Sequence, residues 1–309
     1  MHDWLCHGLS LPRQFGTILA KIGSFWGFPM TTTRLQPTHK TLTVNGLRIH
    51  YLEWGAANAP PVICVHGYTS SAEAFSALAR RLQHRVRIIA PDVRGHGGSD
   101  WSPEGAYGYL DQMSDVAALV DRLKLEQFAL IGTSMGGIIA MAYAAAHPRR
   151  LKSLVINDIG PDVEQGSQRI TQTVGARPDS FATLEAALQY RREISPITAA
   201  RPEDDQRELA LGVLREASDG RWVWKMDPAY IEQRTARDAP VRPDLWPALQ
   251  SLPCPTLVVW GTTSDVLGEQ QARRMANTLP HGELVSVPGI GHAPTLVEPP
   301  VLEALERLL

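Results

Sequence analysis

The feature that most constrains the fold is an alternation of short apolar runs with helix-patterned segments from Thr41 onward. Such alternation predicts an α/β fold, a mostly parallel sheet with helices on both faces. Asn45-Gly46 between the first two runs predicts an opening hairpin. The runs expected as strands are 41–45, 47–54, 61–65, 86–90, 128–131, 151–156, 256–260 and 284–287, with helices expected around 75–82, 113–123, 135–147 and 301–309.

The alternation stops between about Gly160 and Leu252, where the chain is polar, mixed in charge and helix-like. The apolar strand pattern resumes at Thr256. We therefore expect one sheet domain, built from residues 41–160 and 253–309. A helical cap, residues 161–252, would be inserted after the sixth strand.

Residues 1–40 are expected to be an N-terminal extension of that domain. Apolar side chains recur at helical spacing before Met30, among them Leu11, Phe15 and Ile22. Three interpretations stay open: an interfacial amphipathic helix, a helix packed on the body, or a start placed too far upstream, with Met30 as the natural start. The last is favoured, because the strand pattern begins only near Thr41.

Composition limits the classes of partner. Apolar residues make up 44% and charged residues 20% of the chain, and the formal net charge is -2, so no basic footprint for nucleic acid is present. No run approaches a membrane span. The three widely spaced cysteines, Cys6, Cys64 and Cys254, favour reduced thiols and a cytoplasmic location. The sequence carries no signal for an oligomeric state.

Ser134 is the strongest candidate for a catalytic residue. It lies in the sequence GTSMG, residues 132–136, directly after an apolar strand and at the start of a helix. That context is typical of a nucleophile elbow, in which glycines two residues on either side of the serine allow a very tight turn. We expect this turn to lift the Ser134 hydroxyl above the edge of the sheet.

A serine nucleophile needs a base, and the base needs a carboxylate. His292 follows the last predicted strand in a glycine-flanked loop, which makes it the expected base. Asp265 and Asp158 both follow strands at the carboxyl edge of the sheet, where sites in such folds form. Asp265 is the favoured acid and Asp158 the alternative.

Two backbone amides should stabilise the oxyanion. One is the amide of Met135, directly after the nucleophile. The other is expected in the loop after the strand 61–65, where Gly67 permits a sharp turn and the amide of Tyr68 is the candidate. His96, in the glycine-rich loop 92–99, is expected to brace that loop rather than to bind a metal. Neither a metal site nor a nucleotide-binding motif is found, so no cofactor is expected.

The order Ser134, Asp265, His292, together with the motifs HGY, DVRGHGGS and GTSMGG, resembles the α/β-hydrolase superfamily. Closer in, the segments NDIGP, GTTSDVL and GHAPTL are similar to a capped bacterial branch of esterases and enol-lactone hydrolases. The resemblance implies an eight-stranded, mainly parallel sheet and no cofactor. Asp265 departs slightly from it, because many relatives place the acid three residues after the strand-end glycine, whereas Asp265 lies four residues after Gly261.

The expected function is that of a serine hydrolase, which cleaves an ester or lactone of a small acid through an acyl-enzyme. Trp222 and Trp224 are candidates for pocket lining, together with Gly67, although packing of the cap is the likelier use of both tryptophans. One alternative is a carbon–carbon bond hydrolase for dienoates, which would need a cap arginine such as Arg191 or Arg192. The other is a ligand-binding receptor with vestigial turnover.

Deleting residues 1–29 is predicted to leave activity and thermal stability nearly unchanged, because the strand pattern begins later. Thermal unfolding of the truncated and full-length proteins checks this expectation. A melting temperature lowered by several degrees would show instead that the early segment packs on the body.

Overall fold

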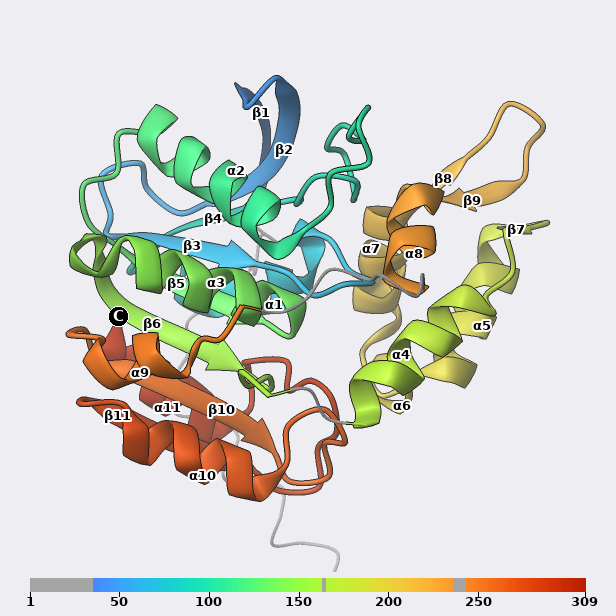
Figure 1. Ribbon diagram of the computed structural model, residues 1–309. Helices are drawn as coiled ribbons and strands as arrows, with labels where there is room; N and C mark the ends of the chain where they lie inside the picture. Colours follow the sequence, from blue (N-terminus) through green and yellow to red (C-terminus); the bar gives the residue numbers. More distant parts are fainter. Residues whose placement is uncertain (1–35, 163–164, 236–242) are drawn as a thin grey trace, which may run out of the picture. The chain divides into compact units, whose positions relative to one another are not determined.

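The computed structural model describes residues 36–162, 165–235 and 243–309 (Figure 1). The expected extension before Met30 lies outside the described residues. The described chain contains an eight-stranded sheet in the order β1-β2-β4-β3-β5-β6-β10-β11. Its strands are β1 (Thr38–Val44), β2 (Leu47–Trp54), β3 (Pro61–Val65), β4 (Arg87–Pro91), β5 (Phe128–Thr133), β6 (Leu151–Asn157), β10 (Thr256–Gly261) and β11 (Gly282–Val287).

The sheet is mostly parallel, as the alternation predicts. Only the β1–β2 and β2–β4 pairs are antiparallel, and every pair from β4 to β11 is parallel. Asn45 and Gly46, both at positive φ, form the turn of the opening hairpin. The first strand begins at Thr38, three residues before the expected position.

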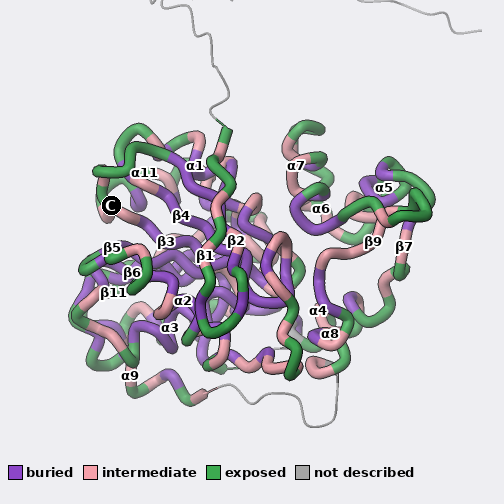
Figure 2. Tube along the Cα trace, turned by 90° about the horizontal axis from the view of Figure 1, so that it is seen from above, coloured by how far each residue is buried: buried purple, intermediate pink, exposed green. Residues whose placement is uncertain are grey.

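Helices cover both faces of the sheet, and the side chains of the central strands alternate between them. In β3, Ile63 and Val65 pack into one apolar cluster, whereas Val62 and Cys64 pack into the other. Figure 2 shows these strands as the buried interior. The first cluster is covered by α2 (Tyr109–Arg122), α3 (Met135–Ala146), α9 (Trp246–Ser251) and α10 (Glu269–Thr278), and the second by η1 (Ala72–Phe75), α1 (Ser76–Leu82) and α11 (Pro299–Leu308).

Two buried cysteines lie in the described chain, Cys64 and Cys254, and both are free thiols. The cytoplasmic location that reduced thiols favour stays a prediction. In the described part of the chain, no helix is both long enough and apolar enough to cross a bilayer.

An insertion follows β6, the sixth strand, as expected. We call residues 161–252 the insertion. It contains a small antiparallel sheet, β7-β9-β8, which the sequence did not predict, because strands of two or three residues are too short to show a period. Its strands are β7 (Ser180–Phe181), β8 (Leu214–Glu216) and β9 (Trp222–Trp224). Its other helices are α4 (Gln165–Gly175), α5 (Leu184–Ile194), α6 (Pro196–Ala199), α7 (Glu203–Val213) and α8 (Pro228–Thr235). The short helix η2 (Pro148–Arg150) lies outside the insertion and precedes β6.

The last helix of the insertion differs from its neighbours. Helix α9 was expected in the cap, but it contacts α3, and its Leu249 is buried in the apolar cluster of the sheet domain. Polar contacts join other parts of the insertion to the sheet domain. Arg80 of α1 binds Asp205 and Glu208 of α7, at 2.7 and 3.0 Å.

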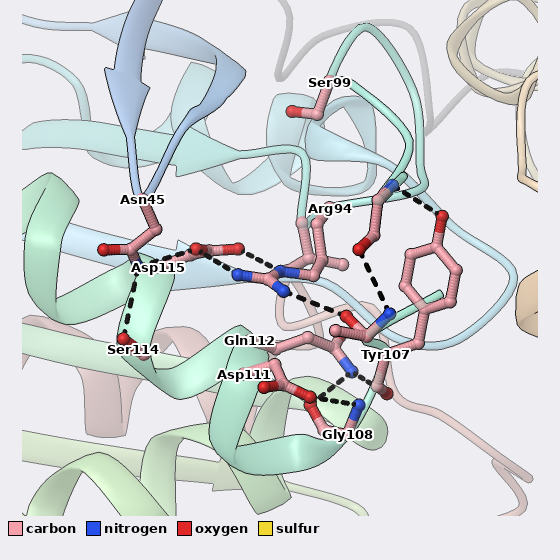
Figure 3. A network of polar contacts seen from close by, with 12 residues as sticks. Asn45, Arg94, Ser99, Tyr107, Gly108, Asp111, Gln112, Ser114 and Asp115 are labelled. Carbon is pink, nitrogen blue, oxygen red and sulfur yellow. Dashed lines mark hydrogen bonds and ion pairs between the residues drawn. The ribbon is translucent and has the colours of Figure 1, made fainter. Parts of the chain in front are cut away.

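A buried ion pair joins the loop after β4 to α2 (Figure 3). Arg94 Nε and Nη2 donate to the two carboxylate oxygens of Asp115, at 2.5 and 2.6 Å. Asn45 of the hairpin donates to the same carboxylate at 2.9 Å. Both side chains of the pair are less than 10% exposed, at 8% and 6%. The pair therefore ties three elements together in a low-dielectric region.

Asp115→Ala is predicted to destabilise the fold by about 3 kcal/mol, because it leaves the Arg94 guanidinium buried without its partner. The matched control is Glu283→Ala, which removes the exposed pair with Arg307 and should cost less than about 1 kcal/mol. Urea unfolding of both variants measures the difference. Equal losses in the two variants would contradict a stabilising role for the buried pair.

Candidate active site

Ser134 occupies a tight turn between β5 and α3. Its backbone has φ 54° and ψ -120°, a conformation that few non-glycine residues adopt. A Cβ on Gly132 would lie 2.2 Å from the carbonyl oxygen of Gly136, and a Cβ on Gly136 would lie 2.0 Å from that of Val65. Only glycine fits at these two positions, so the GTSMG sequence is required by the close approach of helix and strands.

His292 lies beside Ser134, in the loop after β11. Its Nε2 atom is 2.8 Å from the Ser134 Oγ atom, and its Nδ1 atom is 2.8 Å from Oδ2 of Asp158. An ionised carboxylate only accepts hydrogen bonds, so Nδ1 carries the hydrogen and donates it to Asp158. Nε2 is then free to accept the hydrogen of the Ser134 hydroxyl. The three side chains form the arrangement of a Ser-His-Asp triad.

Asp158 is held rigidly at the end of β6. The residue is fully buried, and its second carboxylate oxygen accepts a hydrogen bond from the Gly261 amide at 3.1 Å. Its own amide donates to the Val259 carbonyl at 2.8 Å. Its backbone also has a positive φ of 57°. Contacts with β10 thus fix the direction of the carboxylate toward the histidine.

Asp265 was the favoured partner of His292, and that expectation is wrong. Its side chain is 44% exposed and binds Arg169 of α4, at 2.6 and 3.0 Å. This hydrogen bond is the main reason that the pKa of Asp265 is lowered. Its carbonyl also accepts a hydrogen bond from the Gly166 amide at 2.9 Å. Asp265 therefore anchors the first helix of the insertion.

The sheet order explains the difference. β6 lies between β5, which directly precedes Ser134, and β10. Asp158 follows β6 immediately, whereas Asp265 lies beyond a turn in which the Ser264 amide bonds the Gly261 carbonyl. Asp265 lies four residues after Gly261 rather than three, and its carboxylate binds Arg169 instead of His292.

Two buried histidines shape the loop that contains Gly67 and Tyr68. His66 Nε2 accepts a hydrogen bond from the Val93 amide at 3.1 Å, and Nδ1 donates to the Gly67 carbonyl at 2.8 Å. A Cβ on Gly67 would lie 3.3 Å from the Ser134 Cβ, so this loop passes close to the nucleophile.

His96 fixes the next peptide of the same loop. Its Nε2 atom is 2.6 Å from the Tyr68 carbonyl oxygen. Burial lowers the pKa of His96 to about 3, so the ring is neutral and carries a single hydrogen. We assign that hydrogen to Nε2, because its contact with the Tyr68 carbonyl is shorter than the 3.1 Å contact of Nδ1 with the Arg94 carbonyl. The contact agrees with the expected bracing role. Among the described residues, no group of three His, Cys, Asp or Glu side chains is placed to hold a metal ion.

A cavity of about 820 Å³ opens onto Ser134 and His292. It is lined by the Gly67 loop, by the loop that carries His292 and by helices of the insertion. Within the described chain the lining includes neither Trp222 nor Trp224. Trp224 packs on Phe181, and both tryptophans pack against the small apolar cluster of the insertion. These contacts agree with the packing role expected for both.

Arg191 and Arg192, the two arginines considered as partners of a substrate carboxylate, lie in different surroundings. Arg191 lines the cavity, whereas Arg192 binds Gln206 at 2.8 Å and Glu185 at 3.0 Å. Arg201 also lines the cavity, and no local pattern distinguishes it from the other arginines of the insertion.

Comparison with known proteins shows the family of this chain. Residues 60–299 match the family described as "alpha/beta hydrolase fold". The chain belongs to the α/β-hydrolase family. It is therefore a hydrolase of this type.

Three individual α/β hydrolases illustrate the similarity. The chain is 34% identical over 263 residues to a 3-hydroxybutyrate-oligomer hydrolase of Cupriavidus necator, covering 82% of this chain and 89% of that protein. It is 29% identical over 254 residues to a 2-(acetamidomethylene)succinate hydrolase of Mesorhizobium japonicum, covering 82% and 88%. A crystal structure of an alpha/beta hydrolase from Novosphingobium aromaticivorans superposes with a TM-score of 0.78 at 36% identity, covering 88% and 98%.

Asp158→Asn is predicted to lower kcat by about 1,000-fold or more, because an amide partner favours the wrong histidine tautomer. Asp265→Asn should lose far less, since it only weakens the contact with Arg169. Both variants are assayed with the same ester, and circular dichroism verifies that each is folded. A larger loss in Asp265→Asn would return the acid to the loop after β10.

Proposed function

We propose that this hydrolase cleaves a carboxylic ester or lactone of a small acid through an acyl-enzyme intermediate. The observation that carries the proposal is the continuous contact from Ser134 Oγ to His292 Nε2 and from His292 Nδ1 to Asp158, at 2.8 Å each. A hydroxyl in such contact with a neutral imidazole is an activated nucleophile.

In the proposed reaction, the Ser134 oxygen attacks the ester carbonyl while His292 takes its proton. Asp158 holds the tautomer of His292 and stabilises the imidazolium that forms. His292 then returns the proton to the leaving alkoxide. A water molecule, activated in turn by His292, attacks the acyl-enzyme and releases the acid.

The oxyanion is proposed to bind the amides of Met135 and Tyr68. Met135 begins α3, so its amide belongs to the unsatisfied first turn, where the helix dipole favours negative charge. Support for Tyr68 comes from its loop, whose carbonyls are held by His66 and His96 while the adjacent Gly67 lies close to Ser134. Donors held this way need no reorganisation when charge develops.

The insertion is proposed to act as a cap over residues of the sheet domain. It supplies part of the lining of the cavity that contains Ser134, and Arg169 of α4 bridges to Asp265. The relative that hydrolyses 3-hydroxybutyrate oligomers favours an ester of a short hydroxy acid as the substrate of this chain as well.

Ser134→Ala is predicted to reduce ester turnover by about 10⁴-fold or more, because no other group can carry the acyl chain. The assay compares short p-nitrophenyl esters with a dienoate that reports carbon–carbon bond cleavage. Thermal unfolding of the variant controls for folding.

The outcomes separate the candidate functions. Ester turnover that depends on Ser134 supports the proposal, and turnover within tenfold of wild type in Ser134→Ala removes this residue from the mechanism. Preference for the dienoate would favour the carbon–carbon hydrolase. Absence of turnover on both substrates would favour the ligand-binding receptor.

A further inference from the structure

The cavity that contains Ser134 also contains two cationic side chains of the insertion. Arg191 lies in α5, and Arg201 lies between α6 and α7. Among the described residues, neither guanidinium group makes an ion pair or a hydrogen bond. The Nε atom of Arg191 is fully buried and has no hydrogen-bond partner.

Other arginines around this cavity are paired. Arg169, which lines the same cavity, is bound to Asp265. Arg192 follows Arg191 directly in the chain and binds Gln206 and Glu185. Of the three arginines that line this cavity, Arg191 and Arg201 are therefore the two without a bonded partner among the described residues.

Both unpaired groups carry an electrostatic cost. Burial, together with the smaller effect of the Arg201 charge, lowers the pKa of Arg191 to about 10, so the group stays protonated at pH 7. Burial also lowers the pKa of Arg201. The charges of Asp205 and Glu298 offset part of the lowering at Arg201, but two partly desolvated cations near each other without a bonded carboxylate are still unfavourable.

Two carboxylates, Asp205 and Glu298, lie near enough to raise the pKa of Arg201, but neither makes an ion pair with it in the described chain. Asp205 binds Arg80 at 2.7 Å. One carboxylate oxygen of Glu298 accepts hydrogen bonds from the amide and hydroxyl of Thr295, both at 2.8 Å, while its Oε2 atom is buried without a hydrogen-bond partner. Because neither carboxylate bonds Arg201 in the described chain, a carboxylate of the ligand would supply the bonded partner that both arginines lack. A planar guanidinium group matches the geometry of a carboxylate, to which it can donate two parallel hydrogen bonds.

We propose that Arg191 and Arg201 form a carboxylate-binding subsite, and that the substrate is an ester that keeps a free carboxylate. The ester part of this statement rests on the proposed function, whereas the anion site does not. Apolar side chains of the insertion, including Ile194, Ile197 and Leu209, line the same cavity and suit the carbon chain between carboxylate and ester. Binding of the carboxylate would hold the ester carbonyl against Ser134.

The activity test uses matched pairs of acidic and neutral esters. One pair carries the charge on the acyl side, mono-4-nitrophenyl glutarate against 4-nitrophenyl pentanoate. The other carries it on the alcohol side, 3-(butyryloxy)butanoate against its methyl ester. The readout is the ratio of kcat/KM for the acidic and the neutral ester, and the pair with the larger ratio shows which side of the ester carries the carboxylate.

Arg191→Gln and Arg201→Gln should each lower this ratio by about 10- to 100-fold, mainly through KM, which is the size expected for a lost hydrogen bond to a charged group. Arg191→Lys should recover part of the ratio, because it restores the charge without the planar fork. Arg192→Gln is the matched control and should leave the ratio unchanged. Equal ratios in wild type and in both glutamine variants would overturn the subsite.

A binding measurement separates this proposal from the proposed function. Glutarate and inorganic phosphate are titrated calorimetrically into Ser134→Ala and into the same variant with Arg191→Gln. Glutarate binding that is lost with Arg191→Gln supports the subsite even if no ester is cleaved, in which case the esterase proposal alone fails. Absence of glutarate binding, or equal binding of phosphate, would overturn the assignment to a carboxylate.

Discussion

The close approach of α3 to the strands β3 and β5 is the constraint on which the site depends. Gly132 and Gly136 leave no room for a side chain, since an added Cβ would overlap backbone atoms of Gly136 and Val65. This contact forces Ser134 into a strained turn at the end of the sheet. The strain is tolerated because buried packing on both sides of the turn fixes the backbone, and it presents the hydroxyl at the start of a helix.

Hydrogen bonds hold the backbone and side chains around that turn in place. Asp158 is tied to β10 through its carboxylate and its amide, while His66 and His96 each hold one carbonyl of the facing loop. Both histidines are buried, and burial lowers the pKa of each, so they act as neutral hydrogen-bonding groups. Of these three histidines, His292 is the one that contacts the Ser134 hydroxyl.

Charge is distributed unevenly over the cavity wall. Arg169 and Asp265 neutralise each other and join the insertion to the sheet domain. Among the described residues Arg191 and Arg201 make no ion pair, so this part of the wall keeps a positive charge that Asp205 and Glu298 offset only in part. Under the proposed function, a cavity that is apolar and cationic on one side, with Ser134 on the other, would select substrates by charge as well as by size.

The sequence by itself determined the sheet, the position of the insertion after the sixth strand, and the places of Ser134 and His292. Those features are local, since strand periods, glycine spacing and turn residues are written in consecutive positions. The choice between Asp158 and Asp265, and the contrast between Arg191 and Arg192, were decided only by the tertiary structure. Each depends on which distant side chain reaches a given carboxylate or guanidinium group, because strand order and helix packing bring together residues that no local pattern relates.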